Sequence, residues 1–227
     1  MTTPVYISSG TFTNGLANIS VNPPTTYASG DLLLLVVQTS NETTSTPSGW
    51  TLIANAGAGT PNSADGVGIW IFGKIATASE TAVTVLDTGN HTLGNMYSFR
   101  YVGDFANIIT NTNSVNTASA TYTANAITTT YPDNLCVVVM GNAVDSNTPS
   151  SPSSVTASGV FGTFTLIESD NSNSGSGGGW SISSSSAQQG LSGIGSSGTI
   201  TGTGTSSTQA NITLALPPVY SRKQITT

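Results

Sequence analysis

The feature that most constrains the fold of this 227-residue chain is an internal near-repeat. Self-similarity at a long period indicates a repeated structural unit. Four segments of the first half recur in the same order in the second half: GDLLLLVVQTS from Gly30 in PDNLCVVVMGN from Pro132, GWTLIANAG from Gly49 in TFTLIESDN from Thr163, GVGIWIFGKI from Gly66 in GGGWSISSSS from Gly177, and NMYSFRYV from Asn95 in NITLALPP from Asn211. This alignment matches Asp31 with Asp133, Leu52-Ile53 with Leu166-Ile167, and Trp70 with Trp180.

The preserved order predicts a duplication of roughly half the chain, and convergence of two similar strand patterns is the alternative. Each copy has one very apolar strand, Leu32 to Val37 or Leu135 to Met140, typical of a strand buried on both faces. A single copy would expose an apolar face, so we expect the two copies to pack as one sandwich. We expect core positions at Leu33, Leu35, Val37, Val137 and Val139.

The rest of the chain fits an all-β protein. Short runs rich in β-branched and aromatic residues alternate with Gly, Pro, Asn and Ser clusters, which favours an antiparallel β-sandwich without helices. The predicted strands are Thr11 to Ile19, Asp31 to Thr39, Trp50 to Ala54, Gly66 to Ile75, Thr81 to Leu86, Asn95 to Val102, Ser119 to Thr123, Leu135 to Asn142, Gly162 to Glu168, Gly179 to Ser184, Gly198 to Thr203 and Ala210 to Leu216. Ser169 to Gly179 is expected to be a flexible loop or a long hairpin tip.

The expected organisation has five parts. They are an N-terminal arm and first strand (1–18), a first β half (19–104), a connecting segment (105–126), a second β half (127–217) and a C-terminal tail (218–227). The two β halves together form one sandwich. The two ends, Met1 to Ser9 and Val219 to Thr227, are expected to act as contact arms.

Charge is scarce. Charged residues make up 6% of the chain, with a net charge of −6 and four Lys or Arg residues, so we expect no basic stripe for nucleic acid. The longest apolar run is too short to span a bilayer, and the first residues lack the pattern of a secretion signal. We expect no membrane partner.

Few residues are suited to catalysis or metal binding. Cys136 lies in an apolar strand and is read as a small buried hydrophobe, one His and one Cys are too few for a zinc site, and the ten acidic residues show no calcium-binding spacing. The glycines Gly193, Gly195 and Gly198 spell G-x-G-x-x-G, but the flanks favour a chance match. We therefore expect no catalytic, cofactor-binding or metal-binding residues, and no cofactor.

His91, the only histidine, lies in the turn-like stretch DTGNHTLGN. No Gly-x-Ser-x-Gly nucleophile elbow accompanies it. A solvent-side loop histidine is the simpler interpretation, so we expect His91→Ala to leave stability and incorporation into a particle unchanged. A carboxylate pair brought together across strands, as in glycosidases, is the enzymatic alternative.

Aromatic residues provide the main candidate for ligand binding. Trp50, Trp70, Trp180 and the tyrosines Tyr97, Tyr101 and Tyr122 can stack on sugar rings wherever they are exposed. The matched positions of Trp70 and Trp180 favour core packing instead.

The repeated segments, GDLLLLVV, PSGWTLI, VGIWIFGKIATASETAVTV and MYSFRYVG, then TTTYPDNLCVVV, TLIESDN, GGGWSISSSSAQQG and ANITLALPP, carry a family resemblance. They resemble a β-sandwich module of tailed-bacteriophage virion surface proteins, of the minor-tail and capsid-decoration type, over roughly Ile19 to Pro217. The resemblance implies a structural or adhesive module, a jelly-roll-like antiparallel β-sandwich as its topology, and no catalytic residue.

These observations lead to one expected function and one alternative. We expect a non-enzymatic structural protein on the surface of a tailed-phage virion, made in the host cytoplasm, as a capsid decoration (cement) or tail-associated subunit. Its expected partners are other virion proteins and copies of itself, with a trimer preferred, because few charges protect the sheet edges. The alternative is an adhesin that binds host-surface glycan.

Overall fold

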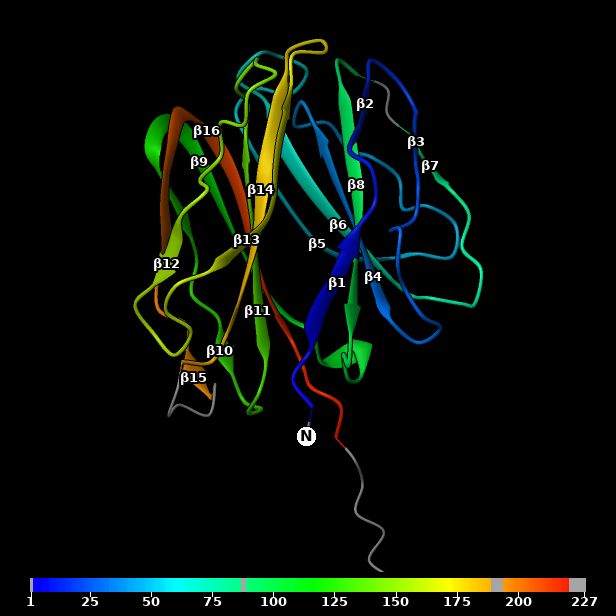
Figure 1. The fold of residues 1–227 in the computed structure, drawn as a ribbon. Helices are drawn as coiled ribbons and strands as arrows, with labels where there is room; N and C mark the ends of the chain where they lie inside the picture. Colours follow the sequence, from blue (N-terminus) through cyan, green and yellow to red (C-terminus); the bar gives the residue numbers. More distant parts are fainter. Residues whose placement is uncertain (1, 87–88, 189–193, 221–227) are drawn as a thin grey trace, which may run out of the picture.

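The computed structural model, which describes residues 2–86, 89–188 and 194–220, is an antiparallel β-sandwich (Figure 1). The expected all-β class is confirmed, since the described residues contain strands and one short 3-10 turn, η1 (Phe105–Asn107). The strands of the first half are β1 (Val5–Ser9), β2 (Thr13–Gly15), β3 (Ile19–Val21), β4 (Leu32–Thr39), β5 (Thr51–Ala58), β6 (Val67–Ile75), β7 (Val83–Val85) and β8 (Thr92–Arg100). Those of the second half are β9 (Ile109–Ala124), β10 (Thr128–Thr129), β11 (Leu135–Asn142), β12 (Val155–Ala157), β13 (Thr165–Ser172), β14 (Gly178–Ser186), β15 (Gly195–Ser196) and β16 (Ile200–Leu216).

Each half of the chain builds one large sheet. The first sheet has the order β1-β8-β4-β6-β5, with β2 also paired to β8. The second has the order β16-β11-β14-β13, with β9 and β12 both paired to β16. The chain completes the first sheet before it starts the second, instead of alternating between the two as in a jelly roll.

The two sheets have the same topology. Strands β1, β8, β4, β6 and β5 of the first sheet occupy the places of β9, β16, β11, β14 and β13 in the second. The two-stranded sheets β3-β7 and β10-β15 also arise at matching points of the two halves. Three of the five matched pairs have equal lengths, with eight residues in β4 and β11, eight in β5 and β13, and nine in β6 and β14. This correspondence supports the predicted duplication.

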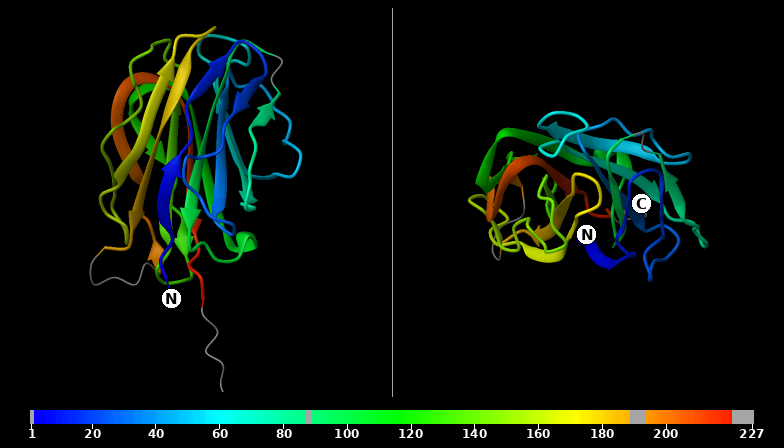
Figure 2. Two further views of the ribbon diagram at one scale, coloured as in Figure 1. Left: turned by 45° about the vertical axis from the view of Figure 1, so that its right-hand side comes forward. Right: turned by 90° about the horizontal axis from the view of Figure 1, so that it is seen from above.

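The two large sheets face each other across a shared core (Figures 1 and 2). Side chains from both sheets form this inner core, including Leu34, Ile71, Val137 and Ile212. Each sheet is also covered on its outer face. The β3-β7 pair covers the first sheet, and the end of β9, β12 and the segment around Phe161 and Phe164 cover the second.

The central strands β4 and β11 are therefore buried on both faces, as predicted. In β4, Leu32, Leu34 and Val36 point into the inner core, whereas Leu33, Leu35 and Val37 point into the outer cluster beneath β3 and β7. Successive side chains of a strand point to opposite faces, so a strand with apolar neighbours on both sides needs a continuous apolar run. All five predicted core positions are buried.

The residue-by-residue alignment of the two halves is wrong by one position at three places. Both halves have a bulge where the edge strand meets its neighbour, between Leu52 and Ala54 and between Leu166 and Glu168, which confirms the match of Leu52-Ile53 with Leu166-Ile167. The first residue after each bulge, Ala54 or Glu168, pairs with Ile71 or Ile182, so Ile71 and Ile182 are equivalent positions of the two halves.

Ile71 and Ile182 pair with Val36 and Val139 on the next strand of each sheet, so Val36 is equivalent to Val139. By the same pairing, Asn95 is equivalent to Ile212. Trp180 then corresponds to Ile69, not to Trp70. Trp180 lies in the inner core and Trp70 packs against the outer cluster, because a slip of one residue moves a side chain to the other face. The same slip applies to the alignment of Asp31 with Asp133.

Two segments outside the expected β halves contain more strand than predicted, since strands were expected there only at Thr11 to Ile19 and Ser119 to Thr123. The expected connecting segment 105–126 contains β9, and the expected arm 1–18 contains β1 and β2. Strand β9 was missed over most of its length because its Thr, Asn and Ser residues do not alternate with large apolar residues, as is usual in an edge strand with little burial. Residues 5–9 of the expected contact arm accordingly form an edge strand of the first sheet, and Met1 lies outside the described residues.

The glycine- and serine-rich stretch from Ser169 to Gly179 is mainly strand. Strand β13 continues to Ser172 and β14 begins at Gly178, leaving a tight hairpin turn between them. Of the expected C-terminal tail, Pro218 and Val219 form isolated bridges with Val102 and Thr2, and residues 221–227 lie outside the described part of the chain.

Candidate functional site

His91 is buried, which corrects its interpretation as a solvent-side loop residue. It precedes β8, its side chain has no exposed surface, and its Nδ1 atom lies 3.1 Å from the hydroxyl oxygens of both Ser40 and Ser176. Those two hydroxyl oxygens are 2.5 Å apart. The cluster ties the end of β4 to the β13-β14 hairpin, so its described hydrogen bonds join the two sheets. Burial leaves the serines without access for a substrate.

We expect His91→Ala to lower the free energy of unfolding by about 1 to 3 kcal/mol, because it removes the hydrogen-bond partner that the imidazole provides to two buried hydroxyls. Denaturant unfolding measures this loss, and the exposed Ser206→Ala is a control that should change stability by less than about 0.5 kcal/mol. An unchanged midpoint for His91→Ala would restore the original interpretation of this residue.

Most of the predicted stacking residues are not available to a ligand. Trp180, Tyr97 and Tyr122 are buried, and Trp50 and Trp70 pack partly buried against the outer cluster of the first sheet. Core packing, the favoured interpretation, is thus confirmed for Trp180. Tyr101 alone of the six is largely exposed, at 48%.

The remaining motifs hold no ligand-binding geometry. Cys136 is buried as expected, and burial raises its thiol pKa. Gly195 lies in β15 and pairs with Thr129 of β10. Strand β16 follows, whereas a dinucleotide site needs a helix at this point. Gly193 lies outside the described residues. Within residues 2–86, 89–188 and 194–220, no group of three or more His, Cys, Asp or Glu side chains is placed to hold a metal ion. No helix in that part of the chain is long and apolar enough to cross a membrane.

The most unusual chemical environment lies between the sheets, at Glu168 of β13. The Asn95 amide on β8 donates to both carboxyl oxygens of Glu168, at 3.0 and 2.8 Å, across the space between the sheets. The Tyr97 hydroxyl hydrogen-bonds to the same carboxyl group and accepts a hydrogen bond of 3.1 Å from Trp180 Nε1. Asp170, two residues further along β13, is a hydrogen-bond neighbour on the same face. We call these five residues the carboxyl cluster.

Burial dominates the titration of this cluster. Desolvation raises the pKa of Glu168, a hydrogen bond with Asp170 raises it further, and the bonds from Tyr97 and Asn95 oppose them, with a resulting pKa of about 8. Burial likewise raises the pKa of Tyr97 well above its usual value, and the nearby Glu168 charge adds to that. Glu168 therefore holds its proton at neutral pH.

The two acids of the carboxyl cluster have no acidic counterpart in the first half. When the two halves are aligned at their bulges, Glu168 is equivalent to Ala54 of β5. Ala54 belongs to the inner core, where β5 faces β9 and β16. Asp170 correspondingly takes the place of Ala56. Sequence reasoning missed the cluster, although the alignment of TLIANAG with TLIESDN contained the signal that acids replace two core alanines.

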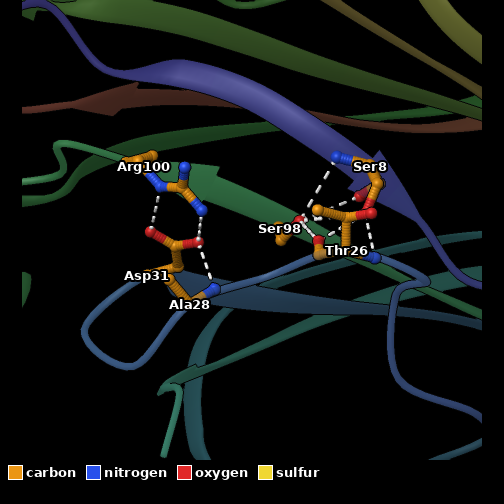
Figure 3. Close-up of polar contacts among 6 residues, drawn as sticks. All are labelled: Ser8, Thr26, Ala28, Asp31, Ser98 and Arg100. Carbon is orange, nitrogen blue, oxygen red and sulfur yellow. Dashed lines mark hydrogen bonds and ion pairs between the residues drawn. The ribbon is translucent and has the colours of Figure 1, made fainter. Parts of the chain in front are cut away.

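A second polar group fixes the start of the first sheet (Figure 3). Arg100 Nε and Nη2 donate to Asp31 Oδ1 and Oδ2, both at 2.9 Å, and Ala28 N donates to Oδ2 at 2.8 Å. Burial alone raises the Asp31 pKa, but the hydrogen bonds from Arg100 and Ala28 outweigh it and lower the pKa. Beside this pair, the Ser98 hydroxyl donates to the carbonyls of Ser8 and Thr26, so β1 is held to β8. These contacts have a structural role, because they hold neighbouring segments of the first sheet together.

A pocket is lined by residues at the two ends of η1 and by residues that follow β16. In Figure 1, η1 and the end of β16 lie at the same end of the molecule. The volume of the pocket is about 510 Å³, and Tyr131, Tyr220, Asp104 and Asn107 contribute polar or aromatic groups to its lining. We call it the terminal pocket. Sequence reasoning did not single out any of these four residues.

No protein-family model matches the chain, and comparisons with curated proteins and with solved structures return no significant match. The fold defines the chain as an all-β sandwich of two topologically equivalent halves.

Proposed function

We propose that this chain is a non-enzymatic structural protein on the surface of a tailed-phage virion, as a capsid decoration or tail-associated subunit. The resemblance of its repeated segments to phage virion modules supports the phage assignment. One feature of the fold, the lack of charge on three edge strands, supports the role in an assembly.

The edge strands of the two large sheets include β1 and β5 in the first sheet and β9 and β13 in the second. Strands β1, β5 and β9 contain no Lys, Arg, Asp or Glu. Glu168 and Asp170 give β13 charged or ionisable groups that face inward, a usual protection of an edge against pairing. Lys74, the one lysine of the predicted strands, lies on the interior strand β6 and pairs with Glu80 at 2.6 Å.

An uncharged edge exposes backbone donors and acceptors that another strand can pair with. Coverage by a neighbouring subunit protects such an edge, so the proposed partners are other virion proteins and copies of this chain, with a trimer preferred. Serine, threonine and asparagine side chains on β9 suit such a contact because hydrogen bonds between neutral groups are insensitive to salt.

We expect the purified chain to sediment as an oligomer, and a lysine on an uncharged edge to shift it towards monomer through desolvation of the introduced charge. Asn55→Lys on β5 and Thr121→Lys on β9 replace exposed side chains. The matched control is Thr165→Lys, also exposed, on the already protected β13. A chain that is monomeric at all concentrations, or that responds equally to the control, would contradict assembly through these edges.

The virion location has its own test. An antibody against the chain is expected to label the surface of intact particles in immunogold electron microscopy. Labelling that is confined to material outside the particles would contradict the proposal.

A host-glycan adhesin is the second candidate function, and the terminal pocket is the observation that favours it.

A further inference from the structure

The terminal pocket has walls that are fixed in the folded chain. Gly103 N donates to Pro217 O at 2.7 Å, and Val219 N donates to Tyr101 O at 3.2 Å. Isolated bridges join Val102 to Pro218 and Val219 to Thr2. A ligand that enters this pocket meets a preformed surface, which lowers the entropic cost of binding.

Two aromatic rings stand on one side of the pocket. The ring centroids of Tyr131 and Tyr220 are 5.6 Å apart with an interplanar angle of 58°, and Tyr220 is 44% exposed. Exposed aromatic rings in a hollow mark a binding site more often than scattered apolar residues do. Their faces match the C–H face of a pyranose ring, which packs on an aromatic face through dispersion and weak C–H contacts.

Hydrogen-bonding groups stand beside the rings. The Asp104 carboxylate accepts from Ala106 N at 3.0 Å through Oδ1, which orients the carboxylate at the start of η1. The exposed side-chain amide of Asn107 has no hydrogen-bond partner among the described residues. A carboxylate and an amide supply the acceptors and the donor that adjacent sugar hydroxyls require.

Charge narrows the ligand class. Asp104 lines the pocket, the Asp133 charge helps to raise the pKa of Tyr220, and no Lys or Arg is among the described lining residues. Phosphorylated or carboxylated sugars would meet the like charge of Asp104, and the described part of the lining offers no cation to compensate it. We propose that the terminal pocket binds a neutral hexopyranoside, with its C–H face on Tyr131 and Tyr220 and its hydroxyls on Asp104 and Asn107. This inference is independent of assembly through the edge strands.

Saturation-transfer difference NMR on the full chain tests the proposal, with methyl glycosides of galactose, glucose and mannose and with lactose as neutral probes. We expect saturation transfer to at least one of them, with a Kd on the order of 1 mM, and less to sialyllactose than to lactose. Tyr220→Ala and Asp104→Asn are expected to weaken binding about tenfold or more, whereas Tyr220→Phe retains it. The matched control is Tyr101→Ala, which removes a similarly exposed tyrosine that does not line the pocket.

No transfer to any neutral probe would overturn the proposal, as would equal losses in Tyr220→Ala and Tyr101→Ala. A change in sedimentation caused by Tyr220→Ala, without a change in sugar binding, would identify the pocket as a protein contact instead. The native chemical-shift pattern of each variant shows that it is folded.

Discussion

Replacing Leu35 by alanine is expected to lower the free energy of unfolding by about 2 to 5 kcal/mol. Leu35 is wholly buried on the outer face of β4, where its ladder partners are Phe72 and Met96. Truncation loses the transfer free energy of the removed carbons and leaves a cavity that the close-packed neighbours fill only in part. Urea unfolding, with the slope of the transition compared between variants, measures the change.

The matched control is Leu52→Ala on the edge strand β5, where the leucine is 40% exposed. We expect it to cost less than about 1 kcal/mol, because much of that side chain is already in contact with water. A loss below about 1 kcal/mol for Leu35→Ala would show that β3 and β7 do not form a packed cover over the first sheet.

Stability is expected to fall as the pH rises from about 4.5 to about 8, and Glu168→Gln is expected to remove this fall. The pKa of Glu168 is raised to about 8 in the folded chain, so between these pH values the folded state holds a proton that the unfolded state has released. The stabilisation is therefore complete below the ordinary glutamate pKa and is lost as the pH passes the folded value. Glutamine stays neutral at every pH and retains an acceptor for Asn95.

At pH 8, Glu168→Gln is expected to be more stable than the native chain by about 1 to 2 kcal/mol, after allowance for solvent screening of a partly exposed group. Unfolding midpoints measured from about pH 2 to pH 9 check this. Asp31 provides the internal control. Because its pKa is lowered in the folded chain, its contribution to stability is lost only in acid. Glu168→Gln should leave this acid loss unchanged. A flat native profile between pH 5 and pH 8 would disprove the raised pKa.

Much of the fold could be predicted from the sequence, because burial on two faces leaves a plain signal. The apolar runs Leu32 to Val37 and Leu135 to Met140 identified the centres of both sheets, and their recurrence identified the duplication. The register could not be predicted. The sequence alignment matched Trp70 with Trp180 because the two residues are of the same type. The strand pairing is set instead by the bulges at Ile53 and Ile167, and the residue pattern of a single strand does not reveal a bulge.

The sites could be predicted less well than the fold. His91 looks like a turn residue because Gly and Asn surround it, but its environment is made by Ser40 and Ser176, which lie far away in the sequence. Glu168 and Asn95 likewise meet only when the two halves face each other. Tyr131 directly precedes the aligned segment that starts at Pro132, and Tyr220 follows the last aligned segment, so no local sequence pattern indicates that the two rings meet.

The replacement of Ala54 and Ala56 by Glu168 and Asp170 shows what fusing two copies into one chain permits. In a homodimer of identical half-chains, an isologous interface would present every residue twice, once on each side of the symmetry axis. A buried acidic pair introduced there would have to be accommodated at both sites, at twice the desolvation cost. A single chain is free of that constraint, so one side of this sandwich keeps small apolar contacts while the other has acquired an ionisable group.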